Sequence, residues 1–228
     1  MIAEKLSWEE FGERARGKTA ILVFGAIEPH GKHLQLDVDI AVPVEIARRV
    51  EAKVPEEAVL FPPVNYGYLY SLRKFPGAIS LEFDTLKAAA RDIFSSLLRN
   101  GISKFLIVIG HGGNTAPVKQ ALKDLSFGHE FTANVVEWWG MLEVEAGHAD
   151  EVEGSMSLAA GGRVVKEPVQ EERADYVGYV VPTPDDLFTP SGYIGKVGGI
   201  NKGKGEKWME EVAEQLAELV RNGLKVRK

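Results

Sequence analysis

The amino-acid sequence predicts an α/β fold, a layered sandwich with a mainly parallel central sheet flanked by helices. Residues 20–24 and 104–109 are short apolar runs with the length of buried strands. Longer amphipathic segments, of which residues 85–100 are the clearest, separate such runs. Strands that alternate with helices in this way are typical of a parallel sheet with crossover connections.

Local patterns predict the elements in chain order. Ser7, with Glu10 three residues later, forms a capping box, which predicts a first helix ending near Gly17. Residues 59–61 are a short apolar run that two prolines stop, as expected for a brief strand. The other expected elements are helices at residues 41–53, 115–125 and 206–222 and a strand at residues 134–138.

The whole chain, residues 1–228, is expected to form one domain. It is long enough to bury a substantial core, and no internal repeat, low-complexity tract or linker divides it. Residues 161–205 are the least regular part, with glycines and prolines throughout. We expect this segment to be an excursion at the active site or at a subunit contact rather than a separate domain.

Composition and charge exclude several classes of protein. A net charge of −6 argues against sequence-independent nucleic-acid binding, which needs a basic face. No apolar run approaches the roughly eighteen residues of a membrane span, and the acidic N-terminal region does not resemble a secretory signal. The absence of cysteine excludes disulfides, thiolate metal sites and cysteine nucleophiles. We therefore expect a cytoplasmic protein whose partner is a small-molecule substrate.

Four of the five histidines lie in clusters that follow predicted strands. The clustered residues are Glu28, His30, His33, Asp37 and Asp39 in the first stretch, His111 between glycines in the second, and His148, Asp150, Glu151 and Glu153 in the third. Because the carboxyl ends of parallel strands meet at one edge of a sheet, these side chains are expected to face one another. His129 lies outside the clusters, and we expect it at the surface.

These residue types favour a metal site. Imidazoles and carboxylates without sulfur suit Zn²⁺, Mn²⁺ or Fe²⁺. A carboxylate can bridge two such ions, and two close ions activate a shared water and polarise a carbonyl group. A metal hydrolase is the favoured interpretation, and solvated loops or a plain binding site are the alternatives. A metal-free hydrolase with paired carboxylates would have no need for His30 and His111.

The sequence resembles the creatininase (creatinine amidohydrolase) family over most of its length. The motifs are EPHGKHL at residues 28–34 with Asp39 after it, similar to the family's E-x-H-G-x-H-L-P-L-x-x-D, then FPGAISL at residues 75–81, GHGGN at residues 110–114, and His148-Ala149 followed by Glu153-Gly154-Ser155. Occurring together in this order, these motifs are specific to the family.

The resemblance implies a layered α/β fold, often assembled as a hexamer, with a two-metal site that hydrolyses non-peptide C–N bonds. By position, Glu28 and His111 would hold one divalent ion and His30 the other. Asp39 would bridge the two ions, because Asp37 matches a position of the motif that is not a ligand.

The third cluster supplies the remaining roles that the resemblance implies. His148 matches a histidine assigned to proton transfer, and Glu153 matches a nearby acid. Creatininase proper has a glutamate ligand where this chain has Gly113. We therefore expect Glu153 to complete the second metal site, with Glu151 as the alternative.

Other departures concern the substrate. Pro29, Asp150 and Gly154 replace residues that are common in creatininase, so creatinine itself is not the first choice. Relatives with the Gly-Gly motif include a deformylase of a formylamino-pyrimidine ribonucleotide in flavin and deazaflavin synthesis, and this substrate class ranks first. Creatinine amidohydrolase and a metal-binding protein without turnover are the alternatives.

Two further groups of residues bear on substrate binding. The glycines and lysines of residues 195–205 could bind a phosphate group, or could form a solvated loop. Aromatic side chains could stack on a planar ring, or could belong to the core or to a subunit contact. These are Tyr66, Tyr68, Tyr70, Trp138 and Trp139.

Overall fold

The central feature of the computed structural model, which describes residues 1–178 and 180–225, is a sheet of four parallel strands. The strands are β1 (Thr19–Phe24), β2 (Ala58–Leu60), β3 (Lys104–Ile109) and β4 (Thr132–Glu137), in the spatial order β2-β1-β3-β4. All three pairs of neighbouring strands are parallel, as short strands linked through helices require. The predicted α/β fold with a parallel sheet is confirmed.

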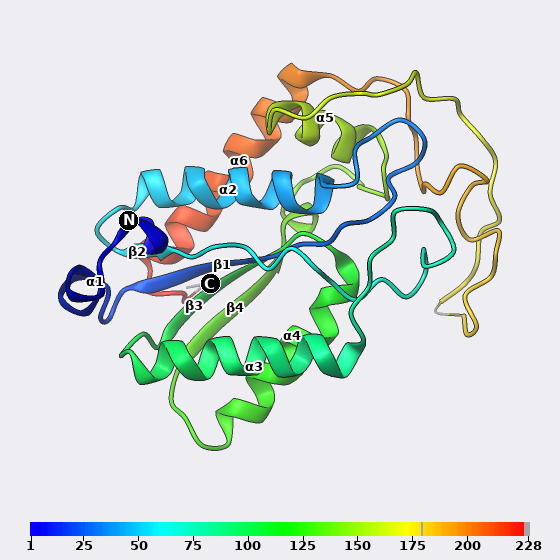
Figure 1. Cartoon of the computed structure of the whole chain (residues 1–228). Helices are drawn as coiled ribbons and strands as arrows, with labels where there is room; N and C mark the ends of the chain where they lie inside the picture. The colour runs from blue at the N-terminus through cyan, green and yellow to red at the C-terminus, as the bar shows by residue number, and fades with distance from the viewer. Residues whose placement is uncertain (179, 226–228) are drawn as a thin grey trace.

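Helices cover both faces of this sheet (Figure 1). The α-helices of the described residues are α1 (Trp8–Arg14), which lies beyond one end of the sheet, α2 (Val38–Lys53), α3 (Phe83–Arg99), α4 (Thr115–Ser126), α5 (Glu151–Ala159) and α6 (Lys202–Arg221). One layer contains α2, α5 and α6, and the opposite layer contains α3 and α4. No helix among residues 1–178 and 180–225 has the length and apolar character that crossing a membrane requires.

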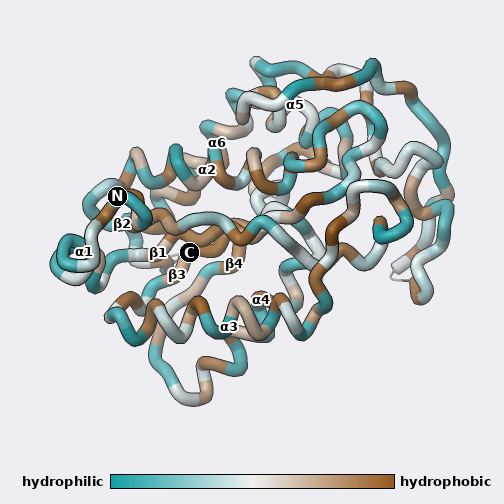
Figure 2. The backbone as a smooth tube through the Cα atoms, viewed as in Figure 1, coloured by the Kyte–Doolittle hydropathy of each residue, from teal (hydrophilic) through white to brown (hydrophobic). Residues whose placement is uncertain are grey.

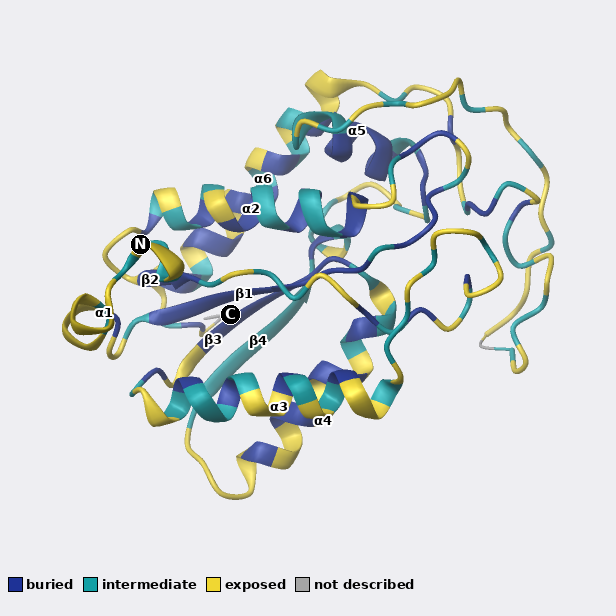
Figure 3. Ribbon diagram, viewed as in Figure 1, coloured by how far each residue is buried: buried dark blue, intermediate teal, exposed yellow. Residues whose placement is uncertain are grey.

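The core lies on both faces of the sheet because the side chains of a strand alternate between them. In β1, Ile21 and Val23 join the cluster formed with α2, α5 and α6, whereas Leu22 and Phe24 join the cluster formed with α3 and α4. All six residues of β1 are buried (Figure 3), and the chain trace is strongly hydrophobic along β1 and β3 (Figure 2). A strand buried on both sides explains why its sequence is a continuous apolar run.

Helix α3 begins at Phe83, close to the predicted residue 85, whereas two other helices begin well before their predicted starts. Helix α2 starts at Val38 rather than at residue 41, so that Asp39 lies in its first turn. Proline is common in the first turn of a helix, so Pro43 favours a predicted start near residue 41. In the structure, a further helical turn precedes Pro43. Helix α6 starts at Lys202 rather than at residue 206, and Asn201 caps it by accepting a hydrogen bond from the Lys204 amide (3.1 Å).

Helix α5 was not predicted from the sequence. Its N-terminal cap is Asp150, which the sequence presents as one more carboxylate of an acidic cluster. The helix packs closely on α6, since a Cβ atom at Gly205 would lie 1.9 Å from the Ser155 carbonyl oxygen. This glycine therefore belongs to a helix contact and not to the loop that was expected at residues 195–205.

Residues 161–178 and 180–201 form a long excursion beside the carboxyl ends of the strands (Figure 1). Its described residues contain no helix or strand, but its backbone is joined to the third cluster. His148 and Ile194 exchange two backbone hydrogen bonds of 2.8 Å, and the Glu151 amide donates to the Lys196 carbonyl oxygen. The excursion thus closes over the edge of the sheet at which the clustered residues gather.

Candidate metal centre

Two glycines place Asp39 between the central strands. Gly25 follows β1 and Gly110 follows β3, and Cβ atoms there would lie 2.5 Å and 2.0 Å from the Asp39 carbonyl oxygen. Pro43 has no N–H to donate to that carbonyl group in the helix. The first turn of α2 can therefore settle against both strand ends, and Asp39 is buried there.

The side chains of the three clusters converge around Asp39. His30 Nε2 lies 3.1 Å from Asp39 Oδ1 and 3.5 Å from Glu153 Oε2. His111 Nδ1 lies 2.8 Å from Glu28 Oε2 and 3.3 Å from Asp39 Oδ2. The two oxygens of Asp39 thus face two different histidines, each of which also faces a second carboxylate.

Backbone carbonyl groups orient the three histidine rings. A carbonyl oxygen can only accept a hydrogen bond, so the ring nitrogen beside it carries the hydrogen. The three pairs are His30 Nδ1 with the Glu28 oxygen, His111 Nε2 with the Tyr68 oxygen, and His148 Nε2 with the Pro29 oxygen, each at 3.0 Å. When a ring is neutral, its other nitrogen faces the site with a free lone pair, as a metal ligand or proton acceptor requires.

The constellation fits divalent cations. Glu28, Asp39 and Glu153 bring three carboxyl groups into one buried region, and Asp39 Oδ2 accepts no hydrogen bond although His111 Nδ1 lies 3.3 Å away. Buried carboxylates require a compensating positive charge. The donor atoms form three groups, and within each group all atoms lie within 4.8 Å of one another. The groups are Glu28 with His30 and His148, Glu28 with Asp39 and His111, and His30 with Asp39 and Glu153. Nitrogen and oxygen donors in this mixture suit zinc-like and manganese-like ions.

Protonation balances part of this charge in the metal-free protein. Burial lowers the pKa of His30, but the carboxylates of Asp39, Glu153 and Glu28 outweigh it and raise the pKa to about 10. Burial opposes ionisation of Asp39 as well, yet the neighbouring imidazoles hold its pKa well below the usual range. Burial raises the pKa of Glu153 to about 8. His30 therefore carries a second proton at neutral pH, and this proton supplies positive charge that a metal ion would otherwise supply.

Helix α5 places the Glu153 carboxylate in the site and the Glu151 carboxylate outside it. Asp150 Oδ1 accepts hydrogen bonds from the amides of Val152 (2.9 Å) and Glu153 (3.1 Å), which fixes the first turn. The Glu153 carboxylate accepts from the Ala149 amide and lies next to His30. Glu151 instead forms an ion pair with Lys204. Of the two carboxylates considered for the second metal, only Glu153 reaches the site.

Other predicted candidates lie elsewhere. Asp37 is exposed, and as the residue before α2 it makes no side-chain cap. His33 is buried, and its Nε2 donates to the Ala149 carbonyl oxygen (2.9 Å) rather than to a carboxylate of the site. His129 is exposed, as expected.

Asn114 and Tyr68 are site residues whose roles could not be recognised in the sequence. Asn114 is fully buried; its Nδ2 donates to the carbonyl oxygens of Phe24 (3.2 Å) and Gly25 (2.9 Å), and its Oδ1 accepts from the Tyr68 amide (3.0 Å). The Tyr68 carbonyl oxygen in turn holds His111. Asn114 therefore joins the ends of β1 and β3 to the loop that orients a candidate ligand.

Gly113 has no room for a side chain. A Cβ atom there would lie 2.1 Å from the Tyr68 carbonyl oxygen and 2.5 Å from His111 Nε2. The hydrogen bond between those two atoms occupies the space. A glutamate at this position could not enter the site without displacing the group that orients His111.

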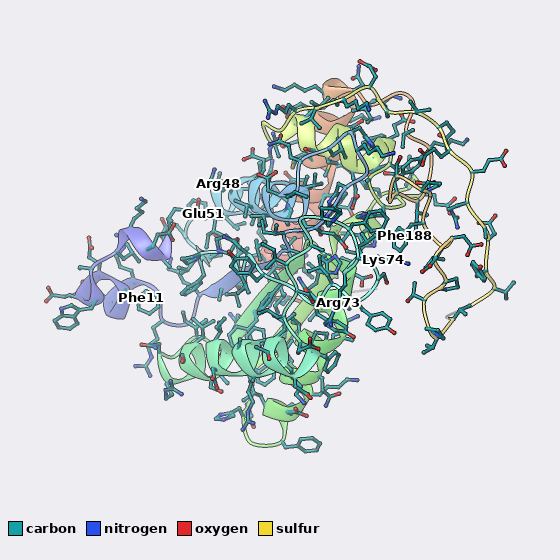
Figure 4. All side chains as sticks on the ribbon, turned by 45° about the vertical axis from the view of Figure 1, so that its right-hand side comes forward. Phe11, Arg48, Glu51, Arg73, Lys74 and Phe188 are labelled. Carbon is teal, nitrogen blue, oxygen red and sulfur yellow. The ribbon has the colours of Figure 1, made fainter. Side chains whose placement is uncertain are left out.

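A cavity of about 580 Å³ opens onto the three clusters. Its aromatic lining residues are Tyr68, Tyr70, Trp139 and Phe188, of which Phe188 belongs to the excursion and is labelled in Figure 4. Phe188 also contacts His148 edge to face, with ring centroids 5.7 Å apart. No Lys or Arg is among the described residues that line this cavity. The other expected aromatic residues do not line it: Trp138 is buried in the core, and Tyr66 is about half exposed at the surface.

The chain is similar in sequence to known enzymes. A creatinine amidohydrolase of Pseudomonas putida is 26% identical over 248 aligned residues, covering 95% of each chain. A mycofactocin precursor peptide peptidase of Mycolicibacterium smegmatis is 32% identical over 107 residues, but this match covers 45% of the chain and 43% of the peptidase.

Solved structures of creatininase have the same fold over nearly the whole chain. One described as creatininase Mn has a TM-score of 0.85 at 25% identity, and a mutant described as the Zn-Zn type has a TM-score of 0.84 at 26% identity. Each match covers 97% of both chains. The family model for creatininase, described as creatinine amidohydrolase, matches residues 4–220. This chain therefore belongs to the creatininase family.

Proposed function

We propose that this chain is a dinuclear metal-dependent amidohydrolase that cleaves a non-peptide C–N bond of a small molecule. The observation that carries the proposal is the position of Asp39, whose two oxygens face His30 and His111 in a buried region with two further carboxyl groups. Relatives described with Mn and with Zn-Zn support divalent ions. Fe²⁺ suits the same donors.

Each ion would take its own donors and share one. Glu28 and His111 would hold one ion, His30 and Glu153 the other, and Asp39 would contact both. Two such ions supply a nucleophilic water at neutral pH and polarise the amide carbonyl group. The closed environment around Glu153 and Asp39 strengthens these electrostatic effects, because little bulk water screens them.

His148 has the position of a proton carrier. Its Nε2 donates to the Pro29 carbonyl oxygen, while its Nδ1 lies 3.8 Å from Glu153 Oε2 at the cavity wall. Burial, followed by the charge of His30, lowers the pKa of His148 to about 3 in the metal-free protein. A neutral ring with its free nitrogen toward the cavity can accept a proton from the attacking water and return it to the leaving nitrogen.

The cavity favours a substrate without a phosphate group. The proposed ions would offset the carboxylates, and no Lys or Arg of the described lining is left to bind a phosphate. The lysines of residues 195–205 do not line this cavity: Lys204 pairs with Glu151, and Lys196 lines a separate cavity of about 370 Å³. An uncharged or cationic planar amide, such as a cyclic amide or an N-formyl arylamine, therefore ranks above the formylamino-pyrimidine ribonucleotide.

A substrate panel tests this proposal. Metal-free protein would be loaded with Mn²⁺ or Zn²⁺ and assayed with creatinine, cyclic ureides, N-formyl arylamines and a formylamino-pyrimidine ribonucleotide. We expect hydrolysis of at least one uncharged amide, abolished by a chelator and restored by metal. Two bound ions without any hydrolysis would indicate a metal-binding protein without turnover, and hydrolysis of the ribonucleotide alone would contradict the argument on substrate charge. Homo-oligomeric assembly and one domain over residues 1–228 stay predictions from the sequence.

A further inference from the structure

His33 is a buried histidine that the proposed chemistry does not use. It is 3% exposed, and burial lowers its pKa, so that the ring is neutral at neutral pH. Its Nε2–H donates to the Ala149 carbonyl oxygen at 2.9 Å, and its ring contacts Tyr193 edge to face. The bond joins two segments that lie 116 residues apart in the sequence.

The acceptor of this bond lies at an unusual point of the backbone. Ala149 has a φ of +52°, in the left-handed region that residues with a Cβ atom rarely adopt. It directly follows His148, and its amide donates to the Glu153 carboxylate. The turn at Ala149 therefore sets the direction of both His148 and Glu153, and it persists only where other contacts hold it.

The position of the His33 ring is itself fixed by the local backbone. Gly31 has a φ of +61°, and a Cβ atom there would lie 2.6 Å from His33 Cε1 and Nδ1. Only glycine leaves room for the ring to lie back against its own chain. The His33 carbonyl oxygen also accepts from the Val165 amide (2.8 Å), which connects this segment to the excursion.

We infer that His33 is a positioning residue: its hydrogen bond to Ala149 holds the left-handed turn that directs His148 and Glu153 at the metal centre. His33 itself contacts neither the proposed ions nor the cavity of about 580 Å³. The effect on turnover rests on the proposed function, whereas the effect on the turn does not. Loss of this bond should therefore act on Glu153 and His148 without removing a ligand.

Two substitutions separate the hydrogen bond from packing. His33→Gln keeps an N–H at a similar reach, whereas His33→Leu fills similar space without a donor. His129→Leu, at an exposed histidine, is the matched control. Amide hydrogen exchange of peptides covering residues 148–153 reports on the turn, chelator titration on the ion beside Glu153, and kcat and KM on catalysis.

We expect His33→Leu to accelerate exchange in residues 148–153, to ease removal of one ion, and to lower kcat by about 10- to 100-fold, the usual effect of losing an orienting contact behind a metal site. KM should stay near the wild-type value, and His33→Gln and His129→Leu should resemble the wild type. If the Leu variant does not fold, His33→Met supplies an equivalent side chain without a donor.

Two results would overturn the inference. Equal impairment in the Gln and Leu variants would show that the shape of the ring matters and not its hydrogen bond. Unchanged exchange and unchanged metal retention in the Leu variant would show that Ala149 holds its conformation without His33. If the wild type hydrolyses no amide, the proposed function fails, yet hydrogen exchange still decides on the role of His33.

Discussion

Replacing Asp39 with alanine should weaken the binding of both proposed metal ions at once. Asp39 Oδ1 lies 3.1 Å from His30 Nε2, and Asp39 Oδ2 lies 3.3 Å from His111 Nδ1. Each oxygen thus faces a different histidine, so one carboxylate would serve both ions. Replacing a residue that binds a single ion would weaken the binding of that ion alone.

The size of the effect follows from the share of one ligand in a metal site. Structural zinc sites with four ligands bind their ion with a free energy of about 10–16 kcal/mol, which is about 2.5–4 kcal/mol for each ligand. Since about 1.4 kcal/mol is tenfold in affinity, each ion should bind roughly 10²- to 10³-fold more weakly in Asp39→Ala. At most one ion per chain should then survive dialysis against a chelator.

Elemental analysis after such dialysis measures the loss directly, and Asp37→Ala is its matched control. Asp37 lies two residues earlier in the chain, but it is exposed and makes no capping bond. Its replacement should leave metal content unchanged. Two retained ions in Asp39→Ala, or equal losses in both variants, would refute the bridging role.

Three further predictions concern protonation and the geometry of the ligands. His148→Ala should keep both ions yet lose about 10²- to 10⁴-fold in kcat, the range of a general acid or base; loss of metal instead would make His148 a ligand. Metal uptake at pH 7.5 should release at least one proton, because the pKa of His30 is raised to about 10 in the metal-free protein and the ion must displace its proton. The apparent affinity for the metal should therefore rise as the pH rises toward 10 and fall as the pH falls. Calorimetric titration in two buffers of different ionisation enthalpy measures the number of protons released. Metal uptake without proton release would contradict this prediction. Gly113→Ala should weaken metal binding, because its Cβ atom would lie 2.1 Å from the Tyr68 carbonyl oxygen, whereas Gly112→Ala has its nearest neighbour at 3.9 Å and should be tolerated. Equal metal affinity in the two alanine variants would show that this carbonyl oxygen is not needed.

Features that depend on local pattern were predictable from the sequence. The apolar runs of β1 and β3 give the buried strands, and the polar residues after them lie at one edge of the sheet, as parallel strands require. The capping box of Ser7 and Glu10 is present at the start of α1. Because strand ends fix where a loop begins, the convergence of His30, His111 and His148 could be expected from the sequence.

Features that depend on contacts between distant residues were not predictable. Helix α5 is short, and its close contact with α6 at Gly205 exists only after both helices have packed. The same is true of His111, whose ring is oriented by a carbonyl oxygen 43 residues earlier in the chain. The charge of the cavity wall also had to come from the structure, because the lysines of residues 195–205 lie outside it.

Anomalous diffraction from crystals of the metal-loaded protein tests the central claim most directly. The account predicts two metal peaks per chain, one beside Glu28 and His111 and one beside His30 and Glu153, with Asp39 in contact with both. A single peak, or a pair of peaks that Asp39 does not join, would contradict it.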